Sequence, residues 1–481
     1  MNYSVVIYIL GWIMEIEAAF LALPGIVSAI YGEKGGFAFL WVALGSAVAG
    51  SAIILRKPKN MRFYLREGFV TVALSWILMS VIGCLPFVIN GDIPHFADAL
   101  FEMISGFTTT GATVVSDVEG LTKGSLFWRS FSHWIGGMGV LVFLLAIVPM
   151  AGGSHMNLMK AESPGPSVGK LVPKVRQTAK YLYIIYFALT MIEVIFLLFG
   201  GMNLFEALTT SFGTAGTGGF AIWNDGFVSV SPYNQWVVTI FMLLFGVNFG
   251  FYFLILTGKL RDALKFEEVR IYFIIVIAAA VFIFINLRHF ALYAPAEGIR
   301  QAFFQVASII TTTGFASADF NLWPETSRTI LVLLMFIGAC AGSTGGGIKV
   351  SRFIIACKSF IKEIISYLHP RSVKKIKIEG KPLEHETLRA TNVYFMTYMV
   401  IFAVSVLLVS IENKDLVTNF AAVAATFNNI GPGLSLVGPM ANFGHFTDFT
   451  KYILMFDMLA GRLEIFPMML LFCPAVWKRR R

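Results

Sequence analysis

The sequence predicts an all-α integral membrane protein with ten membrane-spanning helices and four short re-entrant helices. Three observations predict this fold class. The 481 residues are 57% hydrophobic and 14% charged, with a mean hydropathy of +0.75, far outside the range of soluble globular proteins. Apolar runs of about 20 residues recur, long enough to cross a bilayer core of about 30 Å. A short amphipathic segment followed by a glycine-containing loop occurs four times between such runs.

Ten apolar segments are long enough to span the membrane. They cover about residues 4–31, 36–55, 68–91, 126–150, 181–201, 233–257, 271–292, 327–357, 391–411 and 449–477. The N-terminus has neither a basic segment nor a small-residue cleavage site, so no signal peptide is expected. The first helix is therefore predicted to stay in the membrane.

The net charge of +9 is unevenly distributed along the chain. Most Lys and Arg residues lie in alternate loops or at the C-terminal end, at 56–66, 160–180, 259–270, 349–389 and 478–481. The positive-inside rule places these segments in the cytoplasm, with both termini there, as an even number of spans requires. A chain this apolar argues against nucleic acid as a partner. The basic loops instead suggest membrane lipid headgroups or an acidic protein face.

The chain divides into a hairpin and four repeats. The hairpin and its linker cover residues 1–66, and the repeats cover 67–158, 159–258, 259–372 and 373–481. Each repeat has an outer helix, a re-entrant helix, a loop and an inner helix. The re-entrant helices are expected at 96–108, 204–213, 299–310 and 416–427, with start signals at Asn203-Leu204-Phe205-Glu206, Pro295 and Asp415. They cover about 15–20 Å, at most half a bilayer, and irregular backbone at that depth must be buried or line water.

Each of the four loops has a central glycine with a threonine or an asparagine two positions before it. They are Thr109-Thr110-Gly111-Ala112-Thr113, Thr214-Ala215-Gly216-Thr217-Gly218, Thr312-Thr313-Gly314-Phe315-Ala316 and Asn429-Ile430-Gly431-Pro432-Gly433. A unit repeated four times can close a ring, and rings of backbone carbonyls replace the hydration shell of a potassium ion. The alternative is that these glycines serve helix packing alone. Acidic residues that follow the loops could raise the cation concentration at an outer mouth: Asp117, Glu119, Asp225 and Asp319.

These loops and their flanks closely resemble the TrkH family of the Trk/Ktr/HKT superfamily of potassium transporters. The resemblance runs over essentially the whole chain and rests on an ordered set of motifs, because one glycine motif alone is weak. The motifs are Trp134-Ile135-Gly136-Gly137-Met138-Gly139, Ala161-Glu162-Ser163-Pro164-Gly165-Pro166, Gln301-Ala302-Phe303-Phe304-Gln305-Val306, Gly338-Ala339-Cys340-Ala341-Gly342-Ser343-Thr344-Gly345-Gly346-Gly347, Asn428-Asn429-Ile430-Gly431-Pro432-Gly433 and Gly461-Arg462-Leu463-Glu464. The leading hairpin also looks like TrkH and unlike the shorter KtrB type. The implied fold is a pseudo-fourfold ring of potassium-channel-like M1-P-M2 repeats.

The resemblance implies a single-chain selectivity filter of backbone carbonyls. Its residues would be Thr109, Thr110, Gly111, Thr214, Ala215, Gly216, Thr312, Thr313, Gly314, Asn429, Ile430 and Gly431. Glycine suits such a loop because inward-turned carbonyls need dihedrals that a Cβ disfavours. The fourth loop lacks threonine and the second has Ala215, so the ring is chemically uneven. We therefore expect discrimination of potassium from sodium to be less strict than in a filter of four identical loops.

A glycine-rich run interrupts the third inner segment. As one helix, residues 327–357 would extend about 45 Å, and the run Gly342, Ser343, Thr344, Gly345, Gly346 and Gly347 predicts a break. By resemblance, this run is an intramembrane gate under the filter, and a passive hinge is the alternative. A nucleotide-binding Walker motif does not fit, because Lys349 comes one position late.

Arg462 lies within the last inner segment, where a charge is costly unless it is paired or faces water. The resemblance implies that this arginine projects into the pore. A cation passing at about 7 Å would feel roughly 2 kcal/mol of repulsion at an effective dielectric near 20. The alternative is an ion pair with Asp457 or Glu464 that braces the helices.

Together these features predict potassium uptake through a gated pore in a bacterial inner membrane. Potassium ions are the cargo, and neither a covalently bound cofactor nor enzymatic activity is expected, since no catalytic motif is visible. A proton- or sodium-coupled symporter on the same scaffold is the main alternative. Intramembrane Glu15, Glu17 and Glu193 could serve it, although polar contacts between helices explain them more simply. His133 is interpreted as a packing or hydrogen-bonding residue. The resemblance implies a homodimer and a cytosolic TrkA-type regulator that binds NAD or ATP/ADP.

Overall fold

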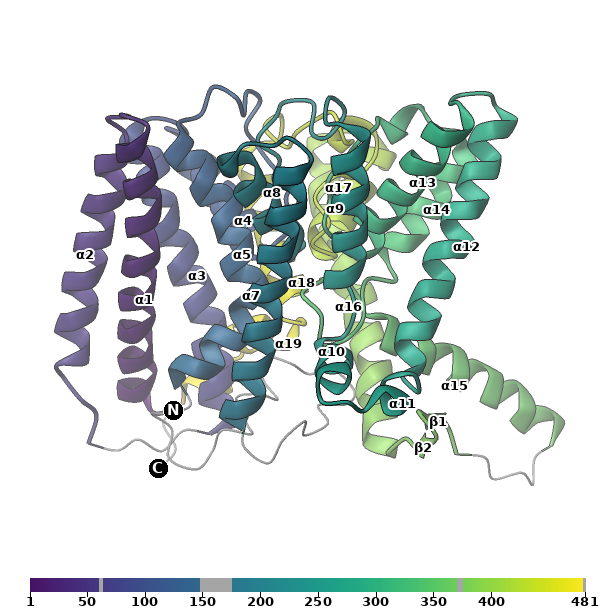
Figure 1. Ribbon diagram of the computed structural model, residues 1–481. Helices are drawn as coiled ribbons and strands as arrows, with labels where there is room; N and C mark the ends of the chain where they lie inside the picture. Colours follow the sequence, from purple (N-terminus) through teal and green to yellow (C-terminus); the bar gives the residue numbers. More distant parts are fainter. Residues whose placement is uncertain (60–63, 148–174, 370–374, 479–481) are drawn as a thin grey trace.

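The computed structural model describes residues 1–59, 64–147, 175–369 and 375–478 (Figure 1). Within these residues, the regular structure is helical except for one short hairpin, β1 (Lys377–Ile378) with β2 (Lys381–Pro382). Both ends of the chain lie at the same end of the helical bundle (Figure 1). The all-helical fold class is confirmed. The predicted motif at 161–166 lies outside the described residues.

Six described helices are long and apolar enough to cross a membrane. They are α1 (Tyr3–Ile30), α2 (Gly36–Ile54), α3 (Leu65–Asn90), α7 (Val175–Phe199) through its part Lys180–Phe199, α12 (Glu267–His289) and α16 (His385–Val409), which continues into η2 (Ser410–Glu412). A bent pair of helices adds a seventh if it counts as one span. The helix α5 (Lys123–Ile147) follows the first short helix. The total of ten spans stays a prediction.

Two segments that were predicted as single spans are divided. Residues 233–257 form α9 (Pro232–Phe245) and α10 (Phe249–Leu256), with a bend of 89° between them. Residues 449–477 form α18 (Asp448–Arg462), α19 (Phe466–Leu471) and α20 (Pro474–Trp477). Whether each of these segments crosses the membrane as one bent span stays a prediction. Proline lacks the N–H that a continuing helix needs and is tolerated in a first turn, and Pro467 and Pro474 each stand at the start of a new helix.

Four short helices stand inside the bundle. They are α4 (Phe96–Phe107), α8 (Leu204–Gly216), α13 (Pro295–Ile310) and α17 (Leu416–Phe427). Their predicted start signals are confirmed. Asn203 and Glu206 form a reciprocal capping box, Pro295 occupies the first turn of α13, and the Asp415 carboxylate accepts from Thr418 N at 2.9 Å.

The third inner segment is interrupted, as predicted. It forms α14 (Glu325–Met335) and α15 (Val350–Leu368), with residues 336–349 between them. The helix α15 projects from the bundle at the end where both termini lie (Figure 1). The remaining short elements are α11 (Leu260–Ala263), η1 (Phe320–Leu322) and η3 (Ser435–Val437).

Aromatic contacts join the N-terminal hairpin to the short helices. Phe20 of α1 packs edge-on against Phe131 of α5, with ring centroids 5.6 Å apart. Trp128 of α5 packs on Phe107, the last residue of α4, at 5.9 Å. The Trp128 indole also donates to the Gly83 carbonyl oxygen at 2.9 Å. This cluster fixes the end of α4, and therefore the loop that follows it, against the outer helices.

Candidate ion pathway

The same backbone turn follows each of the four short helices. We name these turns 1 to 4, at residues 108–111, 216–219, 311–314 and 428–431. In each, the second residue has a left-handed conformation and so does the glycine two residues later. The φ values are 55° and 77° for Thr109 and Gly111, 55° and 80° for Thr217 and Gly219, 60° and 84° for Thr312 and Gly314, and 55° and 96° for Asn429 and Gly431.

The same two hydrogen bonds close every turn. In turn 1, Thr109 N donates to Gly106 O at 3.1 Å and Thr110 N donates to Ser105 O at 2.9 Å. The equivalent bonds in turns 2, 3 and 4 measure 2.8 to 3.1 Å. This pairing is the Schellman motif, which ends helices at a left-handed residue. The four short helices are therefore terminated in one way, and the four turns are equivalent in structure as well as in sequence spacing.

The second turn lies three residues beyond the position that the sequence suggested. Thr214, Ala215 and Gly216 are the last three residues of α8. The residues in the turn are instead Thr217 and Gly219, with Gly218 between them. Residues 214–219 contain two successive Thr-x-Gly patterns, and either of them could mark the turn. Only the position at which the helix ends distinguishes them.

The four turns contact one another in a closed cyclic order. A Cβ added to Gly111 would collide with the carbonyl oxygen of Gly218, and one on Gly431 would lie 2.7 Å from the carbonyl oxygen of Thr110. Likewise, a Cβ added to Gly219 would collide with the carbonyl oxygen of Thr313, and one added to Gly314 would collide with that of Ile430. Each turn therefore touches the next, and turn 4 touches turn 1. A side chain at any of these glycines has no room.

A cavity of ≈ 130 Å³ lies against this ring. All four turn glycines line it, including Gly219 in the second repeat, together with Asn224 and Arg129. Asn224 binds two of the acidic residues predicted at an outer mouth. Its side-chain nitrogen donates to Asp117 at 2.9 Å, and its backbone N donates to Glu119 at 3.0 Å. Hydrogen bonds from Asn224 and from Gly120 N hold the pKa of Asp117 below its usual value.

A buried ion pair lies behind turn 1. Arg129 of α5 approaches the Glu102 carboxylate of α4 at 2.7 Å, and the two side chains are 2% and 0% exposed. Glu102 also accepts from Val114 N at 3.0 Å, and the Arg129 guanidinium stacks on the Phe220 ring at 4.2 Å. The pair thus holds the segments that leave turns 1 and 2. The pair was not predicted, although a charge within each of two apolar segments was the available signal.

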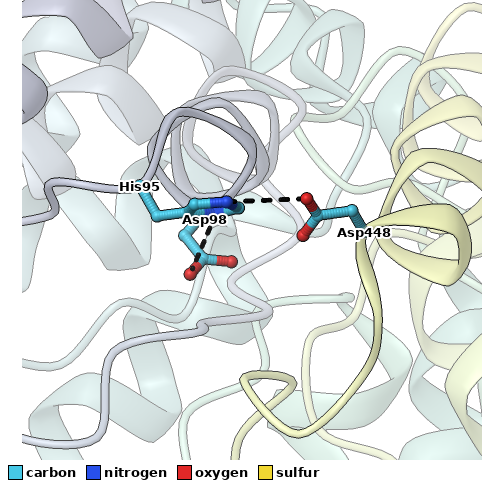
Figure 2. Close-up of side chains that lie close together, drawn as sticks. All are labelled: His95, Asp98 and Asp448. Atoms are coloured by element: carbon cyan, nitrogen blue, oxygen red, sulfur yellow. Dashed lines mark ion pairs between the residues drawn. The ribbon is translucent and has the colours of Figure 1, made fainter.

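A second charged cluster joins the first and last repeats (Figure 2). The His95 ring lies between Asp98 of α4 at 3.6 Å and Asp448 of α18 at 3.5 Å. Lys451 approaches the other oxygen of Asp98 at 2.5 Å. Because an ammonium group already neutralises Asp98, the cluster is a charge bridge between helix starts. It is not built as a cation site. Residues this far apart in sequence form no motif, so this cluster was not predicted either.

The interrupted segment, residues 336–349, packs directly against the ring. Gly346 N donates to the Thr312 hydroxyl of turn 3 at 2.6 Å. A Cβ on Gly346 would lie 2.9 Å from the Asn428 carbonyl oxygen of turn 4. Glu268 of α12 joins the middle of the segment to the first turn of α15, because its carboxylate accepts from Ala341 N at 2.7 Å and from Ser351 N at 3.0 Å.

Arg462, at the end of α18, joins the interrupted segment to α5. Its guanidinium donates to the carbonyl oxygens of Thr344 at 2.8 Å and Gly136 at 2.7 Å. The two acidic residues considered as bracing partners have partners of their own. Glu464 pairs with Arg352 of α15, and Asp457 accepts from the Ser405 hydroxyl at 2.7 Å.

The remaining carboxylates within apolar helices are dispersed. Glu17 of α1 and Glu193 of α7 are buried, and Glu15 accepts from the Ser51 hydroxyl at 2.6 Å. Glu15 and Glu17 lie on α1 and Glu193 lies on α7, and the hydrogen bond of Glu15 lies within the N-terminal hairpin. A role for them in coupled transport stays a hypothesis.

A ring of glycine turns set inside a bundle of apolar helices is typical of membrane proteins that transport ions. The chain belongs to the TrkH family, since a family model described as a cation transport protein matches residues 37–479. The resemblance inferred from the motifs is thereby confirmed. The family consists of transport proteins, so the expectation that the chain is not an enzyme is confirmed as well.

Curated relatives and a solved structure match over the full length. The Trk system potassium uptake protein TrkH of Escherichia coli (strain K12) is 36% identical, with 99% of this chain and 100% of that protein covered. The potassium uptake protein TrkG of the same organism is 31% identical, with 99% of each chain covered. The crystal structure of the potassium transporter TrkH from Vibrio parahaemolyticus matches with a TM-score of 0.89 at 33% identity, covering 99% of this chain and 100% of that one.

Proposed function

We propose that this protein carries potassium ions into the cell through a pore that turns 1 to 4 surround. The observation that carries the proposal is the closed cyclic contact among four turns of identical backbone conformation. Such a ring brings four sets of peptide oxygens around one axis, which is how a protein replaces the water shell of a potassium ion. The full-length relatives that are named as potassium uptake proteins support the same cargo.

The proposed selectivity filter uses one set of carbonyls from each turn. The sets are Thr109, Thr110 and Gly111; Thr217, Gly218 and Gly219; Thr312, Thr313 and Gly314; and Asn429, Ile430 and Gly431. The second set replaces the residues expected from sequence, because the Thr214 carbonyl oxygen already accepts Thr217 N at 3.0 Å. Thr214, Ala215 and Gly216 also belong to α8 itself and not to the turn that follows it.

The proposed membrane arrangement has the hairpin outside the ring and four M1-P-M2 repeats forming it. The short helices enter from the outside and end at the turns, so the negative ends of their dipoles favour a cation at the ring. Both termini face the cytoplasm of a bacterial inner membrane. The basic segments at that end of the bundle support this orientation.

The proposed gate consists of residues 336–349 and Arg462. Contacts from the interrupted segment to turns 3 and 4 support a position directly below the filter. Arg462 adds a fixed positive charge and two hydrogen bonds that hold the segment. A cation that passes a charge at about 7 Å meets roughly 2 kcal/mol of repulsion. Opening therefore requires both the segment and the arginine to move.

The proposed partners lie on the cytoplasmic side. We propose a homodimer of this chain under the control of a cytosolic TrkA-type regulator that binds NAD or ATP/ADP. The helix α15, which projects from the bundle, and the basic hairpin that follows it support a docking region there (Figure 1). Anionic lipid headgroups would contact the same basic residues.

The test compares two glycines of similar conformation in the second repeat. Gly219 (φ 80°) lies in the ring, whereas Gly201 (φ 86°) has open space where a Cβ would go. In liposomes that contain the purified protein, Gly219→Ala should abolish the preference for potassium over sodium, and Gly201→Ala should retain it. Equal selectivity in both variants would refute the assignment of turn 2 to the filter. Flux that follows an imposed proton gradient would favour the coupled symporter instead.

A further inference from the structure

Turn 2 lacks the side chains that brace turns 1 and 3. In those two turns, threonines on either side of the left-handed residue share a hydrogen bond between their hydroxyl groups. These pairs are Thr108 with Thr110 at 2.8 Å and Thr311 with Thr313 at 2.7 Å. The equivalent residues of turn 2 are Gly216 and Gly218. Glycine has no hydroxyl, so turn 2 cannot form this brace.

His133 of α5 occupies the space that the missing side chains leave. A Cβ on Gly218 would collide with the His133 imidazole ring, and one on Gly216 would collide with the His133 backbone. The histidine is completely buried, and its ring packs on Phe220 with centroids 4.3 Å apart. A side chain from the first repeat therefore fills the volume that threonines fill in their own turns.

Both nitrogens of the His133 ring are bonded. Phe220 N donates to Nε2 at 3.2 Å, so the proton of the neutral ring belongs on Nδ1. Nδ1 then donates to the Gly106 carbonyl oxygen at 2.8 Å. That same oxygen accepts Thr109 N at 3.1 Å and closes turn 1, while Phe220 directly follows Gly219 in the chain. The imidazole thus connects the backbone of turn 1 with the backbone that leaves turn 2.

We propose that His133 is a positioning residue of the pore. It sets turn 2 at its distance from turn 1 in place of the absent threonine pair, and it thereby contributes to discrimination among alkali cations. The inference rests on the proposed function, because it requires turn 2 to line the ion pathway. It also predicts that an imidazole at position 133 requires glycine at position 218, because a side chain at position 218 would occupy the same space.

The experiment measures the potassium-to-sodium flux ratio of the full-length protein in liposomes. His133→Gln keeps one donor and one acceptor and should preserve the ratio. His133→Leu keeps a similar volume but removes both hydrogen bonds, and it should lower the ratio about tenfold, the equivalent of one buried hydrogen bond. Gly218→Ala should be defective alone, and His133→Ala in the same chain should partly restore it.

The outcomes separate this inference from the proposed function. A wild-type ratio in His133→Leu would overturn the role of His133, as would a double variant no better than Gly218→Ala. If Gly219→Ala also keeps the wild-type flux ratio, turn 2 is not part of the pathway and the proposed function fails. If Gly219→Ala is defective while His133→Leu is normal, only the inference about His133 fails. His133→Leu and His133→Gln keep the core filled, so the test does not depend on the folding of His133→Ala.

Discussion

The second and third repeats both interrupt their last helix, but they do so with different chemistry. In the second repeat, α9 and α10 meet at a sharp bend, and Asn248 caps the new helix by accepting Gly250 N at 2.7 Å. In the third repeat, residues 336–349 separate α14 from α15. Bonds from Glu268 and Arg462 on other helices add to local bonds such as Val350 N to Ala339 O at 3.0 Å. The short break thus has a helix cap of its own, whereas the long break also depends on side chains from helices that are distant in the sequence.

The two breaks are bonded to each other. Cys340 N donates to the Gly246 carbonyl oxygen at 3.0 Å, and Phe249 N donates to the Gly342 carbonyl oxygen at 2.9 Å. A segment held by contacts from several elements can be released by moving any one of them, whereas a capped bend moves as a unit. The comparison indicates that the long break is the moving part of the proposed gate and that the short break is its support.

Removal of Arg462 should have the largest effect on this arrangement. Arg462→Ala deletes a positive charge and two hydrogen bonds, to Thr344 O and Gly136 O. We expect potassium flux without a regulator to rise on the order of 30-fold, because about 2 kcal/mol of repulsion is lost. Arg328→Ala, which removes an arginine from an exposed contact with Glu325, is the control and should leave flux unchanged. Loss of folded protein in Arg462→Ala would indicate a brace in place of a valve.

Variants of Glu268 test whether contacts from α12 hold residues 336–349 in place. Glu268→Ala leaves Ala341 N and Ser351 N without their acceptor, and a hydrogen bond to a charged group contributes about 1.5–3 kcal/mol. Unregulated flux should rise about tenfold. Glu268→Gln retains an acceptor oxygen and should change the flux less. Equal flux in Glu268→Ala and the wild type would show that the segment is held by other contacts.

Asn248 tests the short break and should have the smallest effect. Asn248→Ala removes a helix cap worth about 1 kcal/mol, which corresponds to a roughly fivefold change in unregulated flux if the bend supports the gate. Ser231→Ala removes the cap at the other end, where the hydroxyl accepts Asn234 N at 3.3 Å. Both variants should lose similar thermal stability, but only Asn248→Ala should alter flux. A similar flux change in both would mean that general destabilisation opens the pore.

Local features of the chain predicted local structure well. The starts of the short helices follow from side chains that bond their own backbone, as at Asn203 and Asp415. The long break follows from glycines 342–347, whose lack of side chains weakens a helix. The bend at residues 246–248 has a weaker signal, a single glycine and an asparagine. Gly246 lies so close to Tyr272 that a Cβ would meet its hydroxyl at 2.6 Å.

The candidate ion pathway was predictable only in part, because local patterns predict local structure and many of its contacts join residues far apart in the sequence. Turns 1, 3 and 4 lie at the predicted loops because only one Thr-x-Gly or Asn-x-Gly pattern follows each helix. Turn 2 was misplaced because two Thr-x-Gly patterns follow one another, and the choice between them depends on where α8 meets α5. The ion pair of Glu102 with Arg129 and the bonds of His133 join residues about 30 to 90 positions apart. No local pattern encodes such pairings.

The sequence by itself determined that this is a helical membrane protein with four short helices, each followed by a glycine-containing loop. Residues that are neighbours along the chain decide which apolar runs are buried, how helix starts are capped and where helices end at glycine. Only the tertiary structure decided which glycine of the second repeat enters the ring, which carbonyls Arg462 binds and which side chain replaces the threonines of turn 2. Those choices depend on which atoms already occupy the space where the helices converge.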